Sequence, residues 1–284
     1  MRDAVSIIET INRRTSCRTY SDRPIEPDKT EALKTFLKAN TASPFGSEIR
    51  FELLDFNEMG MSETRTPGTY GVIKGAGYFM AGAVHHRPNA MEDFGYGMEK
   101  NILRATSLGL GTCWLGGTFH RSGFAEMMNL ADAELLPAVS PVGYSSDSRS
   151  LIDRFFRFSA GSNRRMSWQE LFFDKNINNP LSQESAGPYE TPLACVRIGP
   201  SASNLQPWRI IKNNNRFHFY LRRKPGYKAI FGPIKLQNID MGIAMCHFEL
   251  SSAELGLQGH WQIDDPRIQA GEMEYIASWI PEAF

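Results

Sequence analysis

The chain has 284 residues, enough for one large domain or two smaller units with a substantial core. Its 31 lysines and arginines balance 31 aspartates and glutamates, so no net charge favours nucleic acid, an acidic partner or a membrane surface. No apolar run approaches a membrane span, and the first residues lack the apolar core of a signal peptide, so we expect a cytoplasmic protein. The 4 cysteines form no C-x-x-C pair, so we expect reduced thiols and no metal site.

The chain opens with patterns typical of helices and one strand. Apolar residues at helical intervals predict a short helix over residues 4–11. Capping-box spacing at 28–31, followed by an apolar face, predicts a second helix that ends near Asn40. The residues from 49 to 56 predict a strand after a small-residue turn at 41–47.

Between the two helices lies a segment with the donors that bind phosphate. Arg14 and Arg18 flank two hydroxyl residues, Thr15 and Ser16. A guanidinium offers a planar fork of donors that matches phosphate oxygens, and hydroxyls add further donors. The alternative is a solvated arginine turn, since surface arginine is common.

The middle of the chain alternates strands, a helix and glycine turns. Residues 78–84 predict a buried strand, and residues 96–108 predict a core-facing helix that stops at 109–111. Gly116 and Gly117 follow, where backbone amides can approach a ligand closely, although packing of the helix end is an equal alternative. After a strand at 137–144 comes a basic stretch with Arg164 and Arg165, which by itself fits a solvated helix start.

Residues 199–210 combine rigid, small and amide residues before an apolar strand. Two prolines restrict the backbone, while Ser201, Asn204 and Gln206 place hydroxyl and amide groups on the turn. Such groups suit a planar heterocycle, and an ordinary proline-bounded turn is the alternative. We call residues 200–206 the lip. A β-hairpin over 208–221 and a long helix through 239–250 that ends at Gly256 complete the predicted elements.

The second half repeats the order of elements of the first. Residues 174–190, with few apolar residues, are the expected linker. An offset of 147 residues places Gly109 on Gly256, and an offset of 159 places Arg50 on Arg209. We therefore infer an internal duplication, with unit one at residues 1–175 and a shortened unit two at 190–284.

Three motifs together resemble the nitroreductase family. They are R-x-S-x-R-x-Y-x-x-x-P from Arg14, G-L-G-T-C-W-L-G-G from Gly109, and P-S-x-x-N-x-Q-P-W from Pro200. The lip comes in the last third of the chain, which best fits the fused-repeat "TM nitroreductase" branch of that family. The resemblance implies an α+β fold, in which two units with mixed, mainly antiparallel sheets packed by helices form a pseudo-dimer.

The resemblance also implies the cofactor and its contacts. FMN would be held by residues of both units: Arg14, Thr15, Ser16, Arg18, Gly116, Gly117, Arg164, Arg165, Ser201, Ala202, Asn204 and Gln206. Unit two shows no R-x-S-x-R copy, and residues 41–47 of unit one lack the asparagine, glutamine and Pro-Trp pair of the lip. We therefore expect one FMN per chain and a monomer.

The activity implied is that of an FMN-dependent NAD(P)H oxidoreductase. NADH or NADPH would deliver hydride to flavin N5 in a ping-pong cycle, and a small-molecule acceptor would then be reduced, with a nitroaromatic or quinone as an artificial acceptor. The chemistry belongs to the cofactor, so no catalytic side chain is assigned. The alternatives are a non-catalytic flavin-binding module, acting as a store, sensor or regulated subunit, and a protein that has lost FMN.

Overall fold

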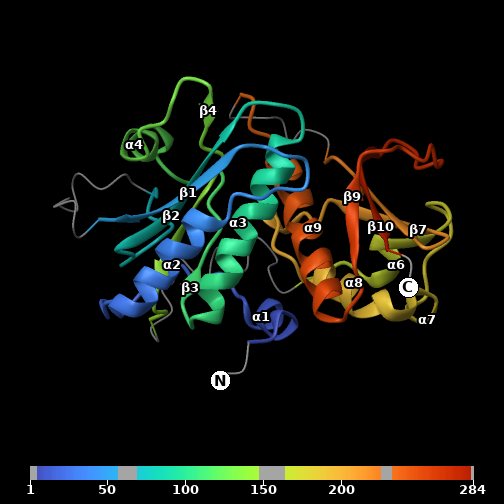
Figure 1. Cartoon of the computed structure of the whole chain (residues 1–284), viewed down its shortest axis with the longest axis horizontal. Coiled ribbons are helices and arrows are strands. Elements are labelled where there is room, and N and C mark those ends of the chain that lie inside the picture. Colours follow the sequence, from blue (N-terminus) through green and yellow to red (C-terminus); the bar gives the residue numbers. More distant parts are fainter. Residues whose placement is uncertain (1–4, 57–68, 147–163, 225–231, 283–284) are drawn as a thin grey trace.

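The computed structural model describes residues 5–56, 69–146, 164–224 and 232–282. They form an α+β fold with two five-stranded sheets (Figure 1). The elements in chain order are α1 (Ile7–Arg13), α2 (Pro27–Ala39), β1 (Ile49–Asp55), β2 (Tyr78–His85), α3 (Ala90–Ser107), β3 (Gly111–Thr112), α4 (Arg121–Met127), β4 (Glu134–Leu135), β5 (Val139–Gly143), α6 (Trp168–Leu171), β6 (Phe172–Asp174), α7 (Gln183–Ala186), η1 (Gly187–Tyr189), α8 (Glu190–Arg197), η2 (Ala202–Asn204), β7 (Trp208–Asn213), β8 (Arg216–Leu221), α9 (Leu236–Glu254), β9 (Gly259–Gln262) and β10 (Glu274–Pro281).

The first sheet has the strand order β1-β2-β5-β3, and β4 pairs with the end of β2. All of these pairings are antiparallel. β2 is buried at six consecutive positions, because helices cover it on both faces and strands flank it on both sides. This sheet carries the predicted strands at 49–56, 78–84 and 137–144, which are confirmed.

The second sheet has the order β6-β7-β8-β10-β9. β6 runs parallel to β7, and the remaining neighbours are antiparallel, so the sheet is mixed as expected. β7 and β8 are the predicted hairpin, with Asn214 at its turn in the left-handed region (φ 54°). The turn residues therefore correctly predicted the pairing of β7 with β8.

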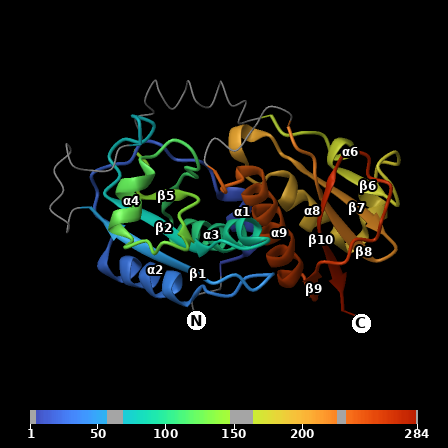
Figure 2. The same ribbon diagram turned by 90° about the horizontal axis from the view of Figure 1, so that it is seen from above.

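Two long helices, α3 and α9, lie side by side between the sheets (Figures 1 and 2). They cross at a pair of glycines: a Cβ on Gly95 would lie 2.2 Å from the carbonyl oxygen of Ile239, and a Cβ on Gly242 would lie 1.9 Å from that of Glu92. The offset of 147 places Gly95 on Gly242 and Glu92 on Ile239. The two contacts are therefore the same contact made in both directions, which is the pattern of a twofold-related interface.

Two sequence-based predictions about local structure are wrong. The capping box at 28–31 does not form, because α2 begins earlier: Pro27 occupies the first helical turn, where its missing N–H and fixed φ are tolerated, and Glu26 is the N-cap. The stretch 174–190 is not a linker. It contains α7 and η1, and Leu181, Ala186 and Tyr189 are buried in the core of the second sheet.

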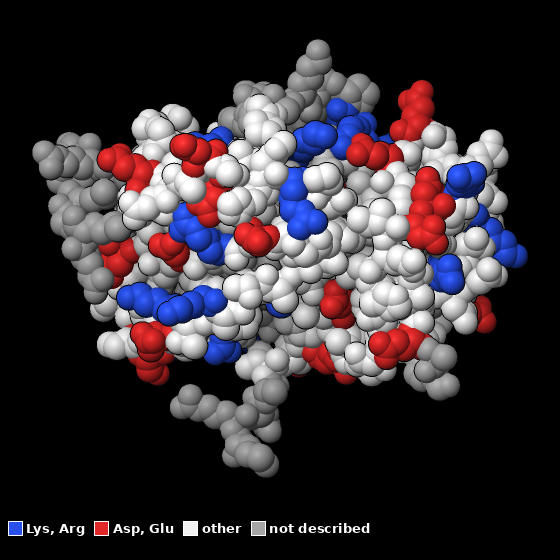
Figure 3. Space-filling view, turned by 45° about the horizontal axis from the view of Figure 1, so that its top comes forward, with Lys and Arg blue, Asp and Glu red and all other residues white. Residues whose placement is uncertain are grey.

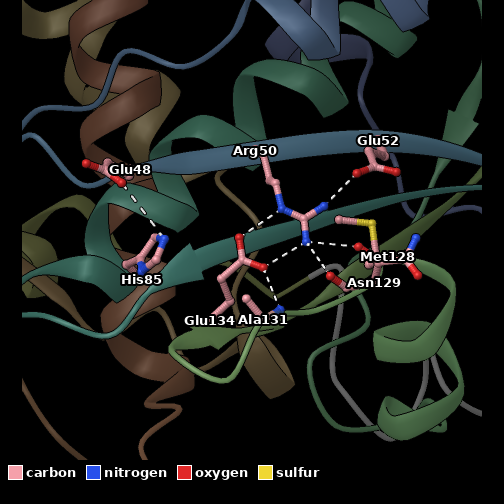
Figure 4. Close-up of polar contacts among 8 residues, drawn as sticks. All are labelled: Glu48, Arg50, Glu52, His85, Met128, Asn129, Ala131 and Glu134. Carbon is pink, nitrogen blue, oxygen red and sulfur yellow. Dashed lines mark hydrogen bonds and ion pairs between the residues drawn. The ribbon is translucent and has the colours of Figure 1, made fainter.

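A guanidinium ties β1 to the turn that precedes β4 (Figure 4). Arg50 donates from Nε and Nη2 to the two carboxylate oxygens of Glu134, each at 2.8 Å, and from Nη2 to the carbonyl oxygen of Met128 at 2.9 Å. Glu134 also accepts from the backbone of Ala131 at 3.0 Å. Because two parallel hydrogen bonds fix the geometry, this pair holds β1 to β4 at the edge of the first sheet.

Basic and acidic side chains are interspersed over the face drawn in Figure 3, in keeping with the balanced composition. Within the described part of the chain, no helix is both long and apolar enough to cross a membrane. The same residues contain no group of three or more histidines, cysteines or acids placed to hold a metal ion. The four cysteines are free thiols.

Candidate cofactor site

A cleft of about 630 Å³ opens where segments from both halves of the chain meet. Its volume lies within the range of small-molecule sites. Most of its lining comes from four segments: the end of α1 with the loop after it, the residues after β3, the lip, and the first turns of α9. Ala138, Arg165 and Ile198 complete the lining. The arginines of the loop after α1 and the lip, which are 186 residues apart from Arg14 to Pro200, therefore share one cavity.

The loop after α1 is fixed to the first sheet. The backbone of Cys17 donates to Thr112 of β3 at 2.8 Å, and Lys74 donates to the carbonyl oxygen of Arg18 at 2.9 Å. Ser16 pairs with Thr112 as a parallel bridge. The loop thereby extends the sheet edge, and Arg14, Thr15, Ser16 and Arg18 all line the cleft.

The cleft is cationic at neutral pH. Arg14, Arg18 and Arg165 line it, and Asp240 is the one acid among the described lining residues. Burial raises the pKa of Asp240 to about 8, so this acid carries a proton at pH 7. Burial, followed by the charges of Arg14 and Arg197, lowers the pKa of Arg165, which indicates that the guanidiniums of Arg14 and Arg165 repel each other.

Arg14 has unused donor capacity. The residue is 9% exposed, and its buried Nε has no hydrogen-bond partner within residues 5–56, 69–146, 164–224 and 232–282. A buried donor without a partner costs about 1–3 kcal/mol, more when charged. An anion in the cleft would satisfy this donor and relieve the repulsion between the arginines.

The lip has a strained backbone. Ser203, Asn204 and Gln206 take φ values of 51°, 54° and 48°, in the left-handed region that non-glycine residues seldom occupy. Two hydrogen bonds hold this shape. Within the lip, Gln206 donates its backbone N–H to Ser201 Oγ at 2.9 Å, and Ala202 donates its backbone N–H to Asp240 Oδ1 of α9 at 2.9 Å. Such strain persists where the surroundings over-determine it, as they do in binding sites.

The basic stretch at 164–166 supports the lip from behind. Arg165 donates to Asn204 Oδ1 and to the carbonyl oxygen of Ile198, the latter at 3.1 Å. Asn204 in turn donates to the carbonyl oxygen of Arg164 at 2.8 Å, and Met166 donates to Gln206 Oε1 at 2.8 Å. The basic stretch and the lip thus form one braced unit.

The structure brings ten of the twelve predicted residues to the cleft and leaves out two. Arg164 has an exposed side chain and contributes only its carbonyl oxygen, whereas Gln206 is 3% exposed and braces the lip. Gly116 lines the cleft, but its lack of a Cβ also has a packing reason, since a Cβ there would lie 2.7 Å from Leu236 Cδ2. This neighbour is a side chain at the start of α9, so the contact does not test packing of the α3 helix end, the open alternative for the glycines.

Sequence reasoning missed the apolar walls and the acid. Ile11, Ile198, Leu236, Ile239 and Ile243 line the cleft. Helical spacing placed Ile11, Ile239 and Ile243 on apolar helix faces, and no role was predicted for Ile198 or Leu236. Nothing in that spacing distinguishes a core face from a cleft wall. Asp240 had a signal that went unused, because it is an acid inside an otherwise apolar helical run.

Trp114, also in the cleft wall, is held from behind by a buried network. Its indole N–H donates to Glu99 Oε2 at 2.7 Å, and Glu99 Oε1 lies 2.9 Å from Nε2 of His247. Nδ1 of His247 lies 2.9 Å from the carbonyl oxygen of Cys195. Glu99 and His247 are fully buried and link α3 to α9, so this wall is rigidly positioned.

Comparisons with known proteins give one family and several related structures. The family described as "Putative TM nitroreductase" matches residues 6–252. A "putative nitroreductase" from Thermotoga maritima MSB8 matches with a TM-score of 0.62 at 16% identity, over 99% of this chain and 95% of that one, which shows the fold. An FMN-dependent nitroreductase from Clostridium difficile R20291 matches with a TM-score of 0.40 at 21% identity, over 50% of this chain and 90% of that one. A nitroreductase with bound FMN from Bacteroides fragilis NCTC 9343 matches with a TM-score of 0.39 at 19% identity, over 52% and 92%. No curated protein matches the sequence.

Proposed function

Because this chain belongs to the TM nitroreductase family, we propose that it is a flavin-dependent oxidoreductase that holds one FMN in the cleft. The observation that carries the proposal is the buried guanidinium of Arg14, whose Nε has no partner among the described residues in a cavity with two further arginines. A phosphate monoester is the ligand that such a set of donors matches.

The residues of the cleft fit both ends of FMN. Arg14, Arg18 and Ser16 offer donors for the phosphate and the sugar-alcohol chain. Apolar side chains of α9, Ile239 and Ile243, line the cleft and offer an apolar surface for a ring system. The cofactor would therefore lie with its phosphate toward the loop after α1 and its ring toward α9 and the lip.

When bound, FMN supplies two-electron chemistry, taking hydride from NADH or NADPH and passing it to an acceptor such as a nitroaromatic or a quinone. The chain's own contribution is to bind, orient and shield. The braced lip and the Trp114 wall fix the cavity before any ligand enters, which lowers the entropic cost of binding. We assign no catalytic side chain.

The crossing of α3 and α9 supports an internal pseudo-dimer with a single site. Asp93 and Asp240 are related by the offset of 147, and each accepts backbone N–H groups of its own half, from Phe45 and Ser47 in one case and from Ala202 in the other. Only the second half carries the asparagine and glutamine of the lip, and only the first carries the arginine loop. One FMN per chain in a monomer follows from this proposal.

Flavin absorbance of the purified protein, referred to its concentration, tests the cofactor and its stoichiometry. We expect one FMN per chain, with binding weakened at least tenfold when Arg14 and Arg18 are both replaced by alanine. Arg13→Ala is the matched control, because Arg13 is exposed at the end of α1 and does not line the cleft. Equal flavin content in all three proteins would refute the proposed site.

Turnover is tested separately on the FMN-loaded protein. Mixing it with NADH or NADPH without oxygen should bleach the flavin, and adding a quinone should restore the colour. If the flavin stays oxidised with both nucleotides, the protein binds flavin without turnover, which is the non-catalytic alternative.

A further inference from the structure

Asp240 is a buried acid that the cleft's phosphate-binding role leaves unexplained. It is 3% exposed, lines the cleft between the apolar side chains of Ile239 and Ile243, and stands near the lip rather than on the arginine loop. Its Oδ1 accepts from the backbone of Ala202 at 2.9 Å, whereas Oδ2 is buried and has no hydrogen-bond partner among the described residues. A buried carboxyl oxygen without a partner is a costly feature to retain.

The related helix provides an internal comparison. Asp93 holds the equivalent position on α3, and both of its oxygens are used: Oδ1 accepts from Phe45 at 2.9 Å and Oδ2 from Ser47 at 3.0 Å. Asp93 does not line the cleft. The half without a lip motif therefore satisfies its acid completely, while the half that carries the motif leaves one oxygen of Asp240 unsatisfied at the cavity.

We propose that Asp240 recognises the ring system of the bound flavin, donating a hydrogen bond from a protonated Oδ2 to an acceptor atom of the ring, either a carbonyl oxygen or an unprotonated ring nitrogen. This inference rests on the proposed function. Burial raises the pKa of Asp240 to about 8, which keeps the donor proton in place at neutral pH. Asp240 thus serves the ring end of the cleft, as Arg14 serves the phosphate end.

Other titratable groups face the same region. On the cleft side they are Arg14, Arg18, Arg165 and the thiol of Cys113, whose pKa is raised by burial. On α3, Glu92 accepts a hydrogen bond from Asn238 of α9, and burial raises its pKa. On α8, Arg197 donates to the carbonyl oxygen of Met166 at 2.8 Å, and the buried His247 lies further along α9. All of these groups remain when Asp240 is replaced. Their contributions to the pH dependence of flavin binding are therefore the same in the wild type and in the Asp240 variants.

The test uses riboflavin and FMN as paired probes, with binding to the flavin-free protein followed by quenching of flavin fluorescence from pH 6.5 to 9. Riboflavin removes the titration of the phosphate, whose second pKa is about 6. The variants are Asp240→Asn, Asp240→Leu, Asp93→Asn as the matched control, and Arg14→Ala.

We expect Asp240→Leu to weaken both flavins about 2- to 10-fold, because one hydrogen bond is lost. Arg14→Ala should weaken FMN alone, and Asp93→Asn should bind both like the wild type. Wild-type affinity for riboflavin should fall as the pH rises through about 8, and Asp240→Asn should abolish that fall, since an amide donates at every pH.

The sign of the pH effect separates recognition from mere support of the lip. A carboxylate that only accepts from Ala202 becomes a better acceptor on ionisation, so riboflavin affinity would stay level or rise with pH. A level or rising wild-type profile overturns the inference about Asp240 even where FMN binds and depends on Arg14. Wild-type protein that binds neither flavin refutes the proposed function itself.

Discussion

The crossing of α3 and α9 leads to a sharp prediction about stability. In Gly95→Ala, the new methyl group would lie 2.2 Å from the carbonyl oxygen of Ile239, and in Gly242→Ala it would lie 1.9 Å from that of Glu92. Both obstacles are backbone atoms of a packed helix, so the helices must separate by about 1 Å before the contact is acceptable.

The expected change in the free energy of unfolding follows from two opposing effects. Overpacking of a core costs about 1–3 kcal/mol and sometimes more, and here no side chain can rotate away. Replacing a helical glycine by alanine returns about 1 kcal/mol. Because separation also loosens the contacts along both helices, we expect each substitution to lower the free energy of unfolding by at least about 2 kcal/mol, or roughly 5 °C in Tm.

Gly97→Ala is the matched control on the same helix. Its methyl group would meet the ring of Phe51 at 3.0 Å, and a ring edge can shift, so we expect stability within about 1 kcal/mol of the wild type. Urea unfolding followed by tryptophan fluorescence and circular dichroism measures all three variants. The Gly95→Ala, Gly242→Ala double variant should cost less than the sum, since one separation relieves both contacts. Gly95→Ala as stable as Gly97→Ala would refute the geometry.

Further predictions concern single polar groups. Because the folded pKa of Asp240 is raised from 3.8 to about 8, its contribution to stability is full below pH 4 and lost as the pH rises through 8. Urea unfolding at pH 5 to 8 should therefore show wild-type stability falling relative to Asp240→Asn by up to about 1.4 kcal/mol per pH unit; parallel profiles would contradict this. Glu254→Ala removes the carboxylate that accepts hydrogen bonds from Ser6 and from the first N–H groups of α1. It should lower the free energy of unfolding by about 1–2 kcal/mol in the same assay, and an unchanged urea midpoint would contradict this. Glu134→Gln should cost about 1 kcal/mol at pH 7. Because the hydrogen bond from Arg50 lowers the pKa of this acid below its usual 4.5, that cost should shrink as the pH falls below 4.5; a cost that is the same at every pH would show that the charge is immaterial. Asn204→Ala removes the bond from Arg165 and should weaken FMN several-fold in fluorescence titration, whereas unchanged affinity would separate the lip from the arginine loop.

The local sequence was sufficient to predict helices and strands whose residue pattern reflects their own burial. Helical spacing predicted the two long helices, because burial on one face imposes a period on the residues. Apolar runs bounded by turn residues predicted β1, β2, β5 and the β7–β8 hairpin. The linker prediction failed for the opposite reason. The polar stretch from 174 to 190 contributes a few buried residues, such as Leu181 and Tyr189, whose partners lie on other elements.

The candidate site also combines features that can be read from the sequence with features that only the fold reveals. Ten of the twelve predicted residues line the cleft, and seven of these ten carry a guanidinium, hydroxyl or amide group whose chemistry can be read from the sequence. Gln206 does not line the cleft, and an amide that contacts a ligand and an amide that braces a turn look identical in a sequence. Its burial at 3% and its bonds to neighbouring backbone distinguish the two roles only in three dimensions.

The sequence by itself determined the chemical character of this protein: an arginine loop with phosphate-type donors in the first half, a polar lip in the second half, and the spacing from which we infer an internal repeat. Tertiary structure decided which of these groups meet. The crossing at Gly95 and Gly242 brings α9, with Asp240, against the loop that carries Arg14. Such a meeting depends on backbone contacts between residues more than a hundred positions apart, and no local pattern encodes them.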